Sequence, residues 1–298
     1  MLINELSTVL LIFLDGVGIG EKNELNPLAI IENLAPLAHF RDGSAEIIFQ
    51  GRMIPTDARL GVEGRPQSAS GQTTIYTGIN APQTLGYHKQ GFPNETLREI
   101  ISENSIFLQL KRKGIEPNVF ANAYTPQFFQ KTPRWKSATT CAVEAAGMQF
   151  RRLSDLLGRK ALFHDFTNED LIARGFDAPI FSPSEAAEIL ADLTKEFRFT
   201  LYEHFITDKI GHDQDFERAR IHLPLVAKFI RETLRKVNLE KTTVILTSDH
   251  GNIEDLSVRN HTLNDVPTII WGRKRDEIAG QIKDLTDITP AILQLLNE

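Results

Sequence analysis

The chain has 298 residues, of which 41% are hydrophobic and 24% are charged. This composition is typical of globular proteins, so it excludes an intrinsically disordered chain and permits one large α/β domain or two small ones. The net charge of −6 and the lack of a basic stripe argue against a nucleic-acid-binding protein, although phosphate chemistry is still compatible with bound metal ions.

Two further features bear on location. Cys141 is the only cysteine, so no disulfide can form within the chain, and we expect a reducing, cytoplasmic environment. The apolar run from Val9 to Leu14 is short, has no basic residue before it and no small-residue cleavage pattern after it. We therefore expect neither a signal peptide nor a membrane span.

The first predicted element is a buried strand from Thr8 to Leu14 that ends in Asp15 and Gly16. The glycines that follow do not have the spacing of a dinucleotide-binding fingerprint. The next predictions are a helix and the segment that leads out of it, over residues 26–40, and a strand over residues 46–50.

A segment rich in hydroxyl groups and glycine, residues 61–80, leads into a helix that we predict around Thr73–Thr77. A hydroxyl in a loop just before a helix lies where the helix dipole favours a phosphate. The alternative is a serine-rich surface loop. Further on, the apolar spacing predicts a helix over 95–113 and a strand over 118–122. Residues 124–183 have no steady period, so we interpret them as an insertion or lid with two small helices.

The C-terminal part has a clearer pattern. It predicts helices over 184–197, 216–237 and 286–296, and strands over 199–207, 244–246 and 268–271. Asp208 follows the first of these strands, with His212 four residues later, a spacing that lets both side chains reach one metal. Asp249 and His250 follow the second strand directly.

Three predicted strands therefore end in an acid, Asp15, Asp208 and Asp249. The carboxyl ends of parallel strands share one edge of a sheet, where ligands of α/β proteins bind. Histidines at 212, 250 and 261 add imidazoles to this edge, and mixed carboxylate and imidazole ligands favour Zn or Mn over Ca. Two such metals about 4 Å apart form a clamp for displacement at phosphorus.

Five segments in this order resemble the alkaline phosphatase superfamily, and within it the cofactor-independent phosphoglycerate mutases and phosphopentomutases. They are residues 13–16, 66–78, 207–212, 247–252 and 260–262. The resemblance covers roughly residues 8–82 and 199–296 and leaves the middle uncovered. It implies a single α/β domain over residues 1–298, with a mostly parallel central sheet and helices on both faces. The small insertion at about 124–183 would replace a full cap domain.

The resemblance also implies a set of site residues and two divalent metal ions, Zn or Mn, with Mg as a further candidate. One metal would be held by Asp208, His212 and His261. The other would be held by Asp15, Asp249, His250 and a nucleophilic serine. Motif spacing relative to Gly71 and Gly78 favours Ser68 as that nucleophile over Ser70. The mutases have a histidine where this chain has Gln72. Lys209 and Arg65 either balance phosphate charge or are solvated surface residues, the reading that we favour.

The function that we expect is hydrolysis of a small phosphate monoester or diester through a phosphoserine intermediate. The first alternative is a phosphomutase, but the roughly 125 residues between Pro82 and Asp208 leave little room for the cap that retains an intermediate in the mutases. The second alternative is a non-catalytic metal-binding protein, which the complete ligand set disfavours. Substrate identity and oligomeric state stay open, because substrate choice lies in the uncovered middle.

Overall fold

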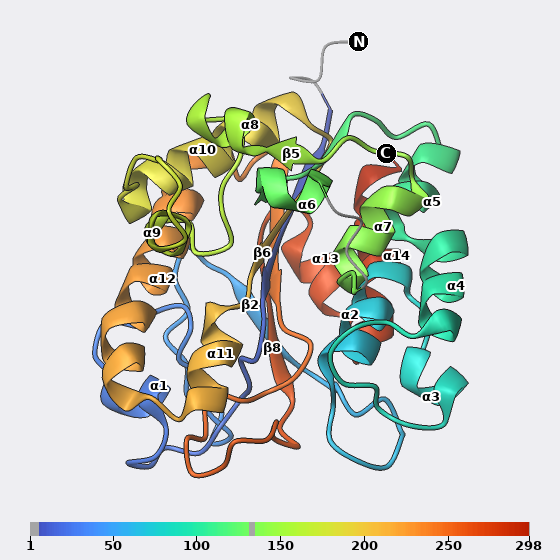
Figure 1. Cartoon of the computed structure of the whole chain (residues 1–298). Coiled ribbons are helices and arrows are strands. Elements are labelled where there is room, and N and C mark those ends of the chain that lie inside the picture. Colours follow the sequence, from blue (N-terminus) through green and yellow to red (C-terminus); the bar gives the residue numbers. More distant parts are fainter. Residues whose placement is uncertain (1–5, 131–134, 298) are drawn as a thin grey trace.

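The computed structural model describes residues 6–130 and 135–297. A six-stranded sheet in the order β2-β8-β7-β1-β6-β3 runs through the middle of the molecule (Figure 1). The strands are β1 (Thr8–Leu14), β2 (Arg52–Thr56), β3 (Asn118–Phe120), β6 (Phe199–His204), β7 (Thr242–Thr247) and β8 (Val266–Gly272).

The central strands of this sheet are parallel. β1 pairs in parallel with both β6 and β7, and β3 pairs in parallel with β6. Only β8 and β2, at one edge, are antiparallel to their neighbours. The predicted mostly parallel sheet is therefore confirmed. Because the strands beside β1 run in its direction, the segments that follow β1, β6 and β7 emerge at one edge of the sheet.

Helices cover both faces of the sheet, as predicted (Figure 1). One face carries α1 (Pro27–Ile30), α8 (Leu153–Leu157), α9 (Glu169–Ala173), α10 (Pro183–Glu196), α11 (Ile206–Asp213) and α12 (Phe216–Lys236). The other carries α2 (Ser68–Thr77), α3 (Ala81–Leu85), α4 (Glu95–Asn104), α5 (Ile106–Arg112), α7 (Ala138–Ala145), α13 (Arg275–Ala279) and α14 (Ile288–Leu296).

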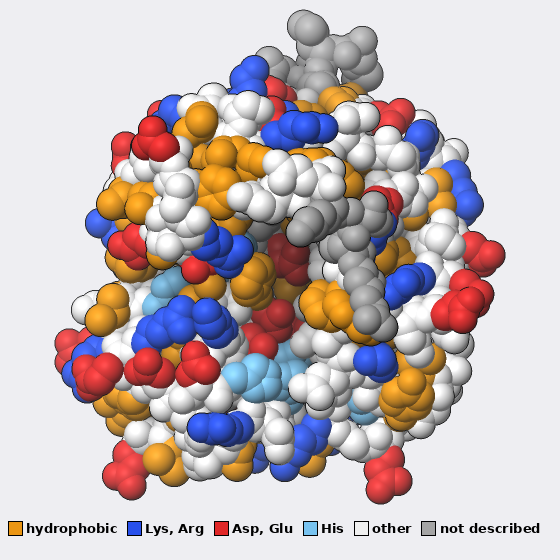
Figure 2. Space-filling model, in the orientation of Figure 1, with side chains coloured by type: hydrophobic (Ala, Val, Ile, Leu, Met, Phe, Trp, Pro, Cys, Tyr) orange, Lys and Arg blue, Asp and Glu red, His pale blue; other side chains and the backbone are white. Residues whose placement is uncertain are grey.

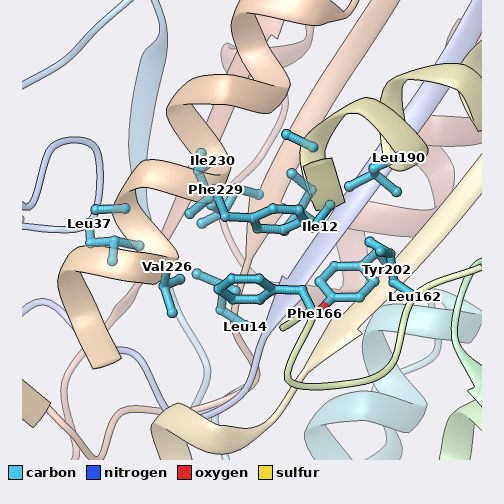
Figure 3. Close-up of a cluster of buried hydrophobic side chains, with 14 of the residues drawn as sticks. Ile12, Leu14, Leu37, Leu162, Phe166, Leu190, Tyr202, Val226, Phe229 and Ile230 are labelled. Carbon is cyan, nitrogen blue, oxygen red and sulfur yellow. The ribbon is translucent and has the colours of Figure 1, made fainter. Parts of the chain in front are cut away.

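Alternation along β1 supplies both apolar cores. Leu10, Ile12 and Leu14 belong to the core under α10 and α12, whereas the residues between them belong to the core under α2 and α14. In the first core, the rings of Phe166 and Phe229 stack with their centroids 4.6 Å apart (Figure 3).

Two sequence predictions in the first sixty residues are wrong. The predicted helix over residues 26–40 is only the four-residue α1, because Asn33 has a positive φ of 62° and Pro36 has no N–H to donate. The predicted strand over residues 46–50 is a loop in which Phe49 and Gln50 both have positive φ, and β2 begins after it, at Arg52.

Three further boundaries differ. The strand predicted over 199–207 ends at His204, so Asp208 lies in the first turn of α11. The helix predicted over 95–113 is interrupted at Ser105, whose hydroxyl caps α5 by accepting a hydrogen bond from the N–H of Leu108. The helix predicted around Thr73 begins five residues earlier, so Ser68 is its first residue instead of a loop residue.

Within 124–183, the described residues contain more structure than two small helices. They include α6 (Pro126–Gln130), α7, α8, α9 and a two-stranded sheet of β4 (Ala123–Tyr124) and β5 (Arg151–Arg152). Helix α7 packs against α2, α4 and α5, so part of the segment extends one helical layer of the core. The division of the chain into one domain with an insertion stays a prediction.

We expect Phe229→Ala to lower the free energy of unfolding by about 3–5 kcal/mol, because it removes a fully buried ring between Phe166 and Tyr202. Denaturant-induced unfolding measures this change. Ile221→Ala on the same helix is the control, because Ile221 is 69% exposed and should change stability by less than about 0.5 kcal/mol. A similar loss in both variants would contradict the packing described here.

Candidate metal centre

Two neighbouring strands bring the first part of the site together. Asp15 follows β1, and Asp249 and His250 follow β7. The Nε2 atom of His250 lies 3.3 Å from Oδ1 of Asp15 and 3.5 Å from Oδ2 of Asp249. Asp249 and His250 are fully buried and Asp15 is nearly so. The parallel pairing of β1 with β7 is what places these groups side by side.

Helix α2 brings Ser68 to the same place. Its Oγ lies 3.0 Å from Nε2 of His250. The helix can approach this closely because residue 71 is a glycine: a Cβ there would lie 2.9 Å from the Cβ of Asp249. Ser70 is oriented differently, since its buried hydroxyl bonds to the backbone of Gln67 and Lys89. Of the two serines, only Ser68 lines the pocket described below.

Asp208, His212 and His261 form the second part of the site. Asp208 Oδ2 lies 3.3 Å from Nε2 of His212, and Oδ1 lies 3.6 Å from Nε2 of His261. His212 follows Asp208 by one turn of α11, so the four-residue spacing brings the two side chains into contact. The ring of His261 also stacks on that of His250 with a centroid distance of 3.5 Å, which joins the two parts.

The orientation of two imidazoles is informative. Nδ1 of His212 bonds to the carbonyl of Arg259 at 2.6 Å, and Nδ1 of His261 bonds to the carbonyl of Pro66 at 2.8 Å. A carbonyl only accepts, so each Nδ1 carries a proton, and Nε2 of each ring presents a lone pair when that ring is neutral. The two Nε2 atoms lie 3.1 Å apart. Two lone pairs directed at each other fit a shared cation, and carbonyl-anchored imidazoles are typical of metal ligands.

The burial of the carboxylates also fits a positive charge nearby. Burial raises the pKa of Asp15 well above its ordinary value, and the adjacent Asp249 raises it further. Burial likewise raises the pKa of Asp249, with a further contribution from Asp208. Within the described residues, Oδ1 of Asp15 and Oδ1 of Asp249 have no hydrogen-bond partner. Buried carboxylates in this state fit metal ligation, because a bound cation supplies the missing charge.

The ligand atoms converge in two groups that could each hold a metal ion. One consists of Asp208, His212 and His261, as the resemblance implied. The other consists of Asp15, Asp208 and His250, with ligand atoms within 4.8 Å of one another. Asp208 therefore stands between the two groups, a position that the sequence did not suggest. Asp249 and Ser68 lie beside the second group, in contact with His250.

Some residues that hydrogen-bond to the candidate ligands were given no such role in the sequence analysis. Gln72 donates through Nε2 to both Asp15 and Asp249, and Asn252 donates to Oδ1 of Asp208 at 2.6 Å. Arg65, predicted as a solvated or phosphate-balancing residue, is exposed and also donates to the carbonyl of His261 at 2.7 Å. Gln72 and Asn252 lie inside the quoted motifs, so their proximity to the ligands was the available signal.

Glu254 holds the loops around the site together. Its carboxylate accepts hydrogen bonds from the backbone N–H groups of Gly18 and Asn252 and from the side chains of Thr262 and Asn264. Gly18 belongs to the loop after β1, and the other three partners belong to the segment between β7 and β8 that also contains Glu254. The sequence around Glu254 did not predict this role, because it depends on how that segment folds and on its contact with the loop after β1.

A cavity of about 590 Å³ opens beside the site. Asp15, Ser68, Asp208 and His212 line one end of it. Figure 2 shows the hollow, with acidic and histidine side chains toward its floor and hydrophobic side chains on either side. The hollow gives a small molecule access to the ligand groups from outside.

The sequence model of the Metalloenzyme superfamily matches residues 7–297. The chain therefore belongs to the Metalloenzyme superfamily. This assignment agrees with the two ligand groups found in the structure and confirms the resemblance to alkaline phosphatase superfamily metalloenzymes that the motifs indicated.

Among curated proteins, similar sequences are 2,3-bisphosphoglycerate-independent phosphoglycerate mutases. The protein from Clostridium botulinum is 32% identical over 97 residues, which are 30% of this chain and 19% of the relative. The protein from Sulfurimonas denitrificans is 28% identical over 129 residues, 40% of this chain and 26% of the relative. The matched parts are thus about a fifth to a quarter of the relatives' length.

Solved structures support the fold. A cold-active alkaline phosphatase from Shewanella sp. aligns with a TM-score of 0.54 at 13% identity, covering 96% of this chain and 99% of that one. Phosphoglycerate mutase from Leishmania mexicana aligns with a TM-score of 0.53 at 10% identity, covering 98% and 95%. The predicted alkaline-phosphatase-like fold is confirmed. In the part of the chain that the structure describes, no helix combines the length and apolarity needed to cross a membrane.

We expect Glu254→Ala to lower the free energy of unfolding by more than about 3 kcal/mol, because four donors in the loops around the site lose their acceptor. Glu254→Gln should cost less, since one oxygen remains to accept. Thermal or denaturant unfolding compares the two. Glu240→Ala, at an exposed position, is the control and should be nearly neutral. If Glu254→Ala were as stable as that control, the linking role of Glu254 would be wrong.

Proposed function

We propose that this protein is a two-metal-dependent phosphohydrolase that cleaves a phosphate monoester or diester through a phosphoserine intermediate. The observation that carries the proposal is the pair of imidazole Nε2 atoms of His212 and His261, 3.1 Å apart and each with its Nδ1 proton held by a carbonyl. Membership in the Metalloenzyme superfamily and the alkaline-phosphatase-like fold support it.

In this proposal, Asp208, His212 and His261 hold one ion, and Asp15, Asp249, His250 and Ser68 hold the other. The mixed oxygen and nitrogen ligands fit Zn or Mn, with Mg as a further candidate. When bound, such ions lower the pKa of a coordinated hydroxyl and offset charge on phosphoryl oxygens. The position of Asp208 between the two groups supports a close pair of ions.

Ser68 is the proposed nucleophile. It is the first residue of α2, where the partial positive charge of the helix N-terminus favours a phosphate. A bond forms between its Oγ and phosphorus while the bond from phosphorus to the substrate alcohol breaks. Ser68 loses its hydroxyl proton and the departing alcohol gains one. Water then takes the phosphoryl group, which restores Ser68 and releases inorganic phosphate from a monoester or a phosphate monoester from a diester.

The alternative is a phosphomutase, the activity in the names of the curated relatives. Those relatives are several times longer than the matched segments. We favour hydrolysis because Ser68 lines the cavity, and the hollow in Figure 2 is open to the surface, so water can reach the intermediate. We further propose that residues 1–298 form one domain with residues 124–183 as its insertion, and that the protein is cytoplasmic.

One assay separates the two functions. The metal-loaded protein is incubated with 3-phosphoglycerate, ribose 1-phosphate and a chromogenic phosphate ester. Hydrolysis releases inorganic phosphate, whereas a mutase returns an isomer with the phosphate still attached. Isomer without free phosphate would contradict our proposal. If neither product forms with Zn, Mn or Mg, a non-catalytic metal-binding role is favoured.

Ser68→Ala should lower turnover by about 10³-fold or more, the range typical for loss of a nucleophile, while the fold stays intact. Mass spectrometry of wild-type protein quenched during turnover should place a phosphate on the peptide that contains Ser68. Ser70→Ala is the matched control: it should keep near-normal turnover, because the Ser70 hydroxyl bonds to backbone atoms outside the site. Loss of turnover in Ser70→Ala alone would show that our choice of nucleophile is wrong.

His212→Ala and His261→Ala should each lower the metal content from about two ions per chain toward one, because both remove a ligand of the same proposed ion. Elemental analysis of the purified variants measures this content. His88→Ala is the control, since His88 bonds to the carbonyl of Val62 away from both groups. Unchanged metal content in both His212→Ala and His261→Ala would contradict the ligand assignment.

A further inference from the structure

The cavity beside the metal centre has two chemically different ends. One end consists of the ligand groups and Ser68. The rest is lined by aromatic side chains from separate parts of the chain: Phe92, Phe120, Tyr124, Phe128, Phe163 and Phe205. Several of these rings contact other rings, with Phe120 and Phe128 both packed on Tyr124. An apolar wall of this extent favours an apolar ligand group.

Several polar groups within this aromatic part already have partners, whereas Nδ1 of His164 has none among the described residues. The amide of Asn122 makes both of its hydrogen bonds to the backbone of Glu203, at 2.7 and 2.9 Å. The hydroxyls of Tyr124, Thr140 and Ser137 bond to one another in a chain, each at 2.9 Å. These groups therefore offer little to a ligand rich in hydroxyls or amides, which would lose hydrogen bonds to water on entry.

The charges of the cavity do not form a second anion site. Arg174 is paired with Asp170, whose Oδ2 lies 2.5 Å from Nη2 of the arginine. Glu203 lies at the cavity wall, where burial raises its pKa to about 7. Lys209 also lines the cavity, is exposed, and belongs to the same helix as Asp208 and His212. A substrate with a second anionic group far from its phosphate would find no unpaired arginine here.

We propose that this cavity selects phosphate esters whose alcohol carries an apolar ring, with the phosphate at the metal centre and the ring packed among the aromatic side chains. This inference rests on the proposed function and names its substrate class. The volume of about 590 Å³ is sufficient for a ring-bearing ester and lies within the usual range of small-molecule sites. Short hydrophilic esters, such as a phosphorylated three-carbon acid, would leave most of the aromatic wall without contact.

Binding of phosphonates tests this selection without turnover, because their carbon–phosphorus bond is not hydrolysed. The probes are methylphosphonate, benzylphosphonate and 2-carboxyethylphosphonate, each titrated calorimetrically into the metal-loaded protein. We expect benzylphosphonate to bind at least about tenfold more tightly than the other two, which corresponds to about 1.4 kcal/mol. Equal affinities, or tightest binding of the carboxylated probe, would overturn the inference.

Two variants locate the effect. Phe92 and Phe205 are 45% and 38% exposed, so replacing either by alanine should leave the fold intact. Phe92→Ala and Phe205→Ala should each reduce the preference for benzylphosphonate by about threefold or more and leave the affinity for methylphosphonate unchanged. Phe49→Ala is the matched control: Phe49 is 40% exposed but lies outside this cavity, so the preference should persist. A preference that neither cavity variant reduces would contradict the proposed position of the ring.

Hydrolysis of ethyl phosphate and benzyl phosphate distinguishes this inference from the proposed function. Both substrates release primary alcohols, so a higher kcat/KM for the benzyl ester reports binding of the ring more than reactivity of the leaving group. Equal kcat/KM values would overturn the selection but leave phosphohydrolase activity standing. No hydrolysis of either ester, together with tight binding of benzylphosphonate, would overturn the proposed function and leave the ring-binding cavity standing.

Discussion

The arrangement of the molecule depends on one electrostatic constraint: three carboxylates and three imidazoles lie within contact distance, and four of the six, Asp15, Asp249, His250 and His261, are buried. Like charges at this separation repel strongly when they are buried, so the site requires compensating positive charge and fixed hydrogen bonds. The protein supplies the bonds from its backbone and from neutral amides. Carbonyls orient His212 and His261, Gln72 joins Asp15 to Asp249, and Asn252 supports Asp208. The parallel central strands and the helices packed on them hold these groups in register.

The sequence predicts the parts of this arrangement that depend on neighbouring residues. A continuous apolar run with an acid at or just after its end predicts both the strand and the position of the candidate ligand, as for Asp15 and Asp249. The position of Asp208 is predicted less accurately, because a turn of helix separates it from its strand. β6 ends at His204, and Asp208 lies in the first turn of α11, where it belongs to both candidate ligand groups. Helix boundaries at Ser68 and Ser105 depend on capping and tertiary contacts that apolar periodicity does not record. Glu254 escapes prediction because its role depends on how the segment between β7 and β8 folds back on itself and on the contact of that segment with Gly18 in the loop after β1.

The structure also separates two determinants of substrate recognition. Residues from the N-terminal and C-terminal thirds of the chain build the end of the cavity that suits a phosphate. Residues of the middle third, among them Tyr124, Phe128 and Phe163, contribute much of the aromatic wall. The resemblance to mutases and phosphatases covers the first set and not the second. A common reaction centre and a different wall are compatible with similar folds and different substrates, which is the usual relation between fold and function.

The contact between Gly71 and Asp249 has a consequence for how Ser68 is positioned. Side chains usually adjust to one another by rotating, but here the main chain of α2 rests against the residue that follows β7. The distance between Ser68 and His250 therefore depends on how closely the backbone of α2 approaches Asp249, and this approach is possible because Gly71 has no Cβ. A single added carbon at residue 71 would act as a spacer between two rigid elements. The distance from Ser68, the proposed nucleophile, to His250 is therefore set mainly by the backbone, and rotation of the short serine side chain can change it only slightly.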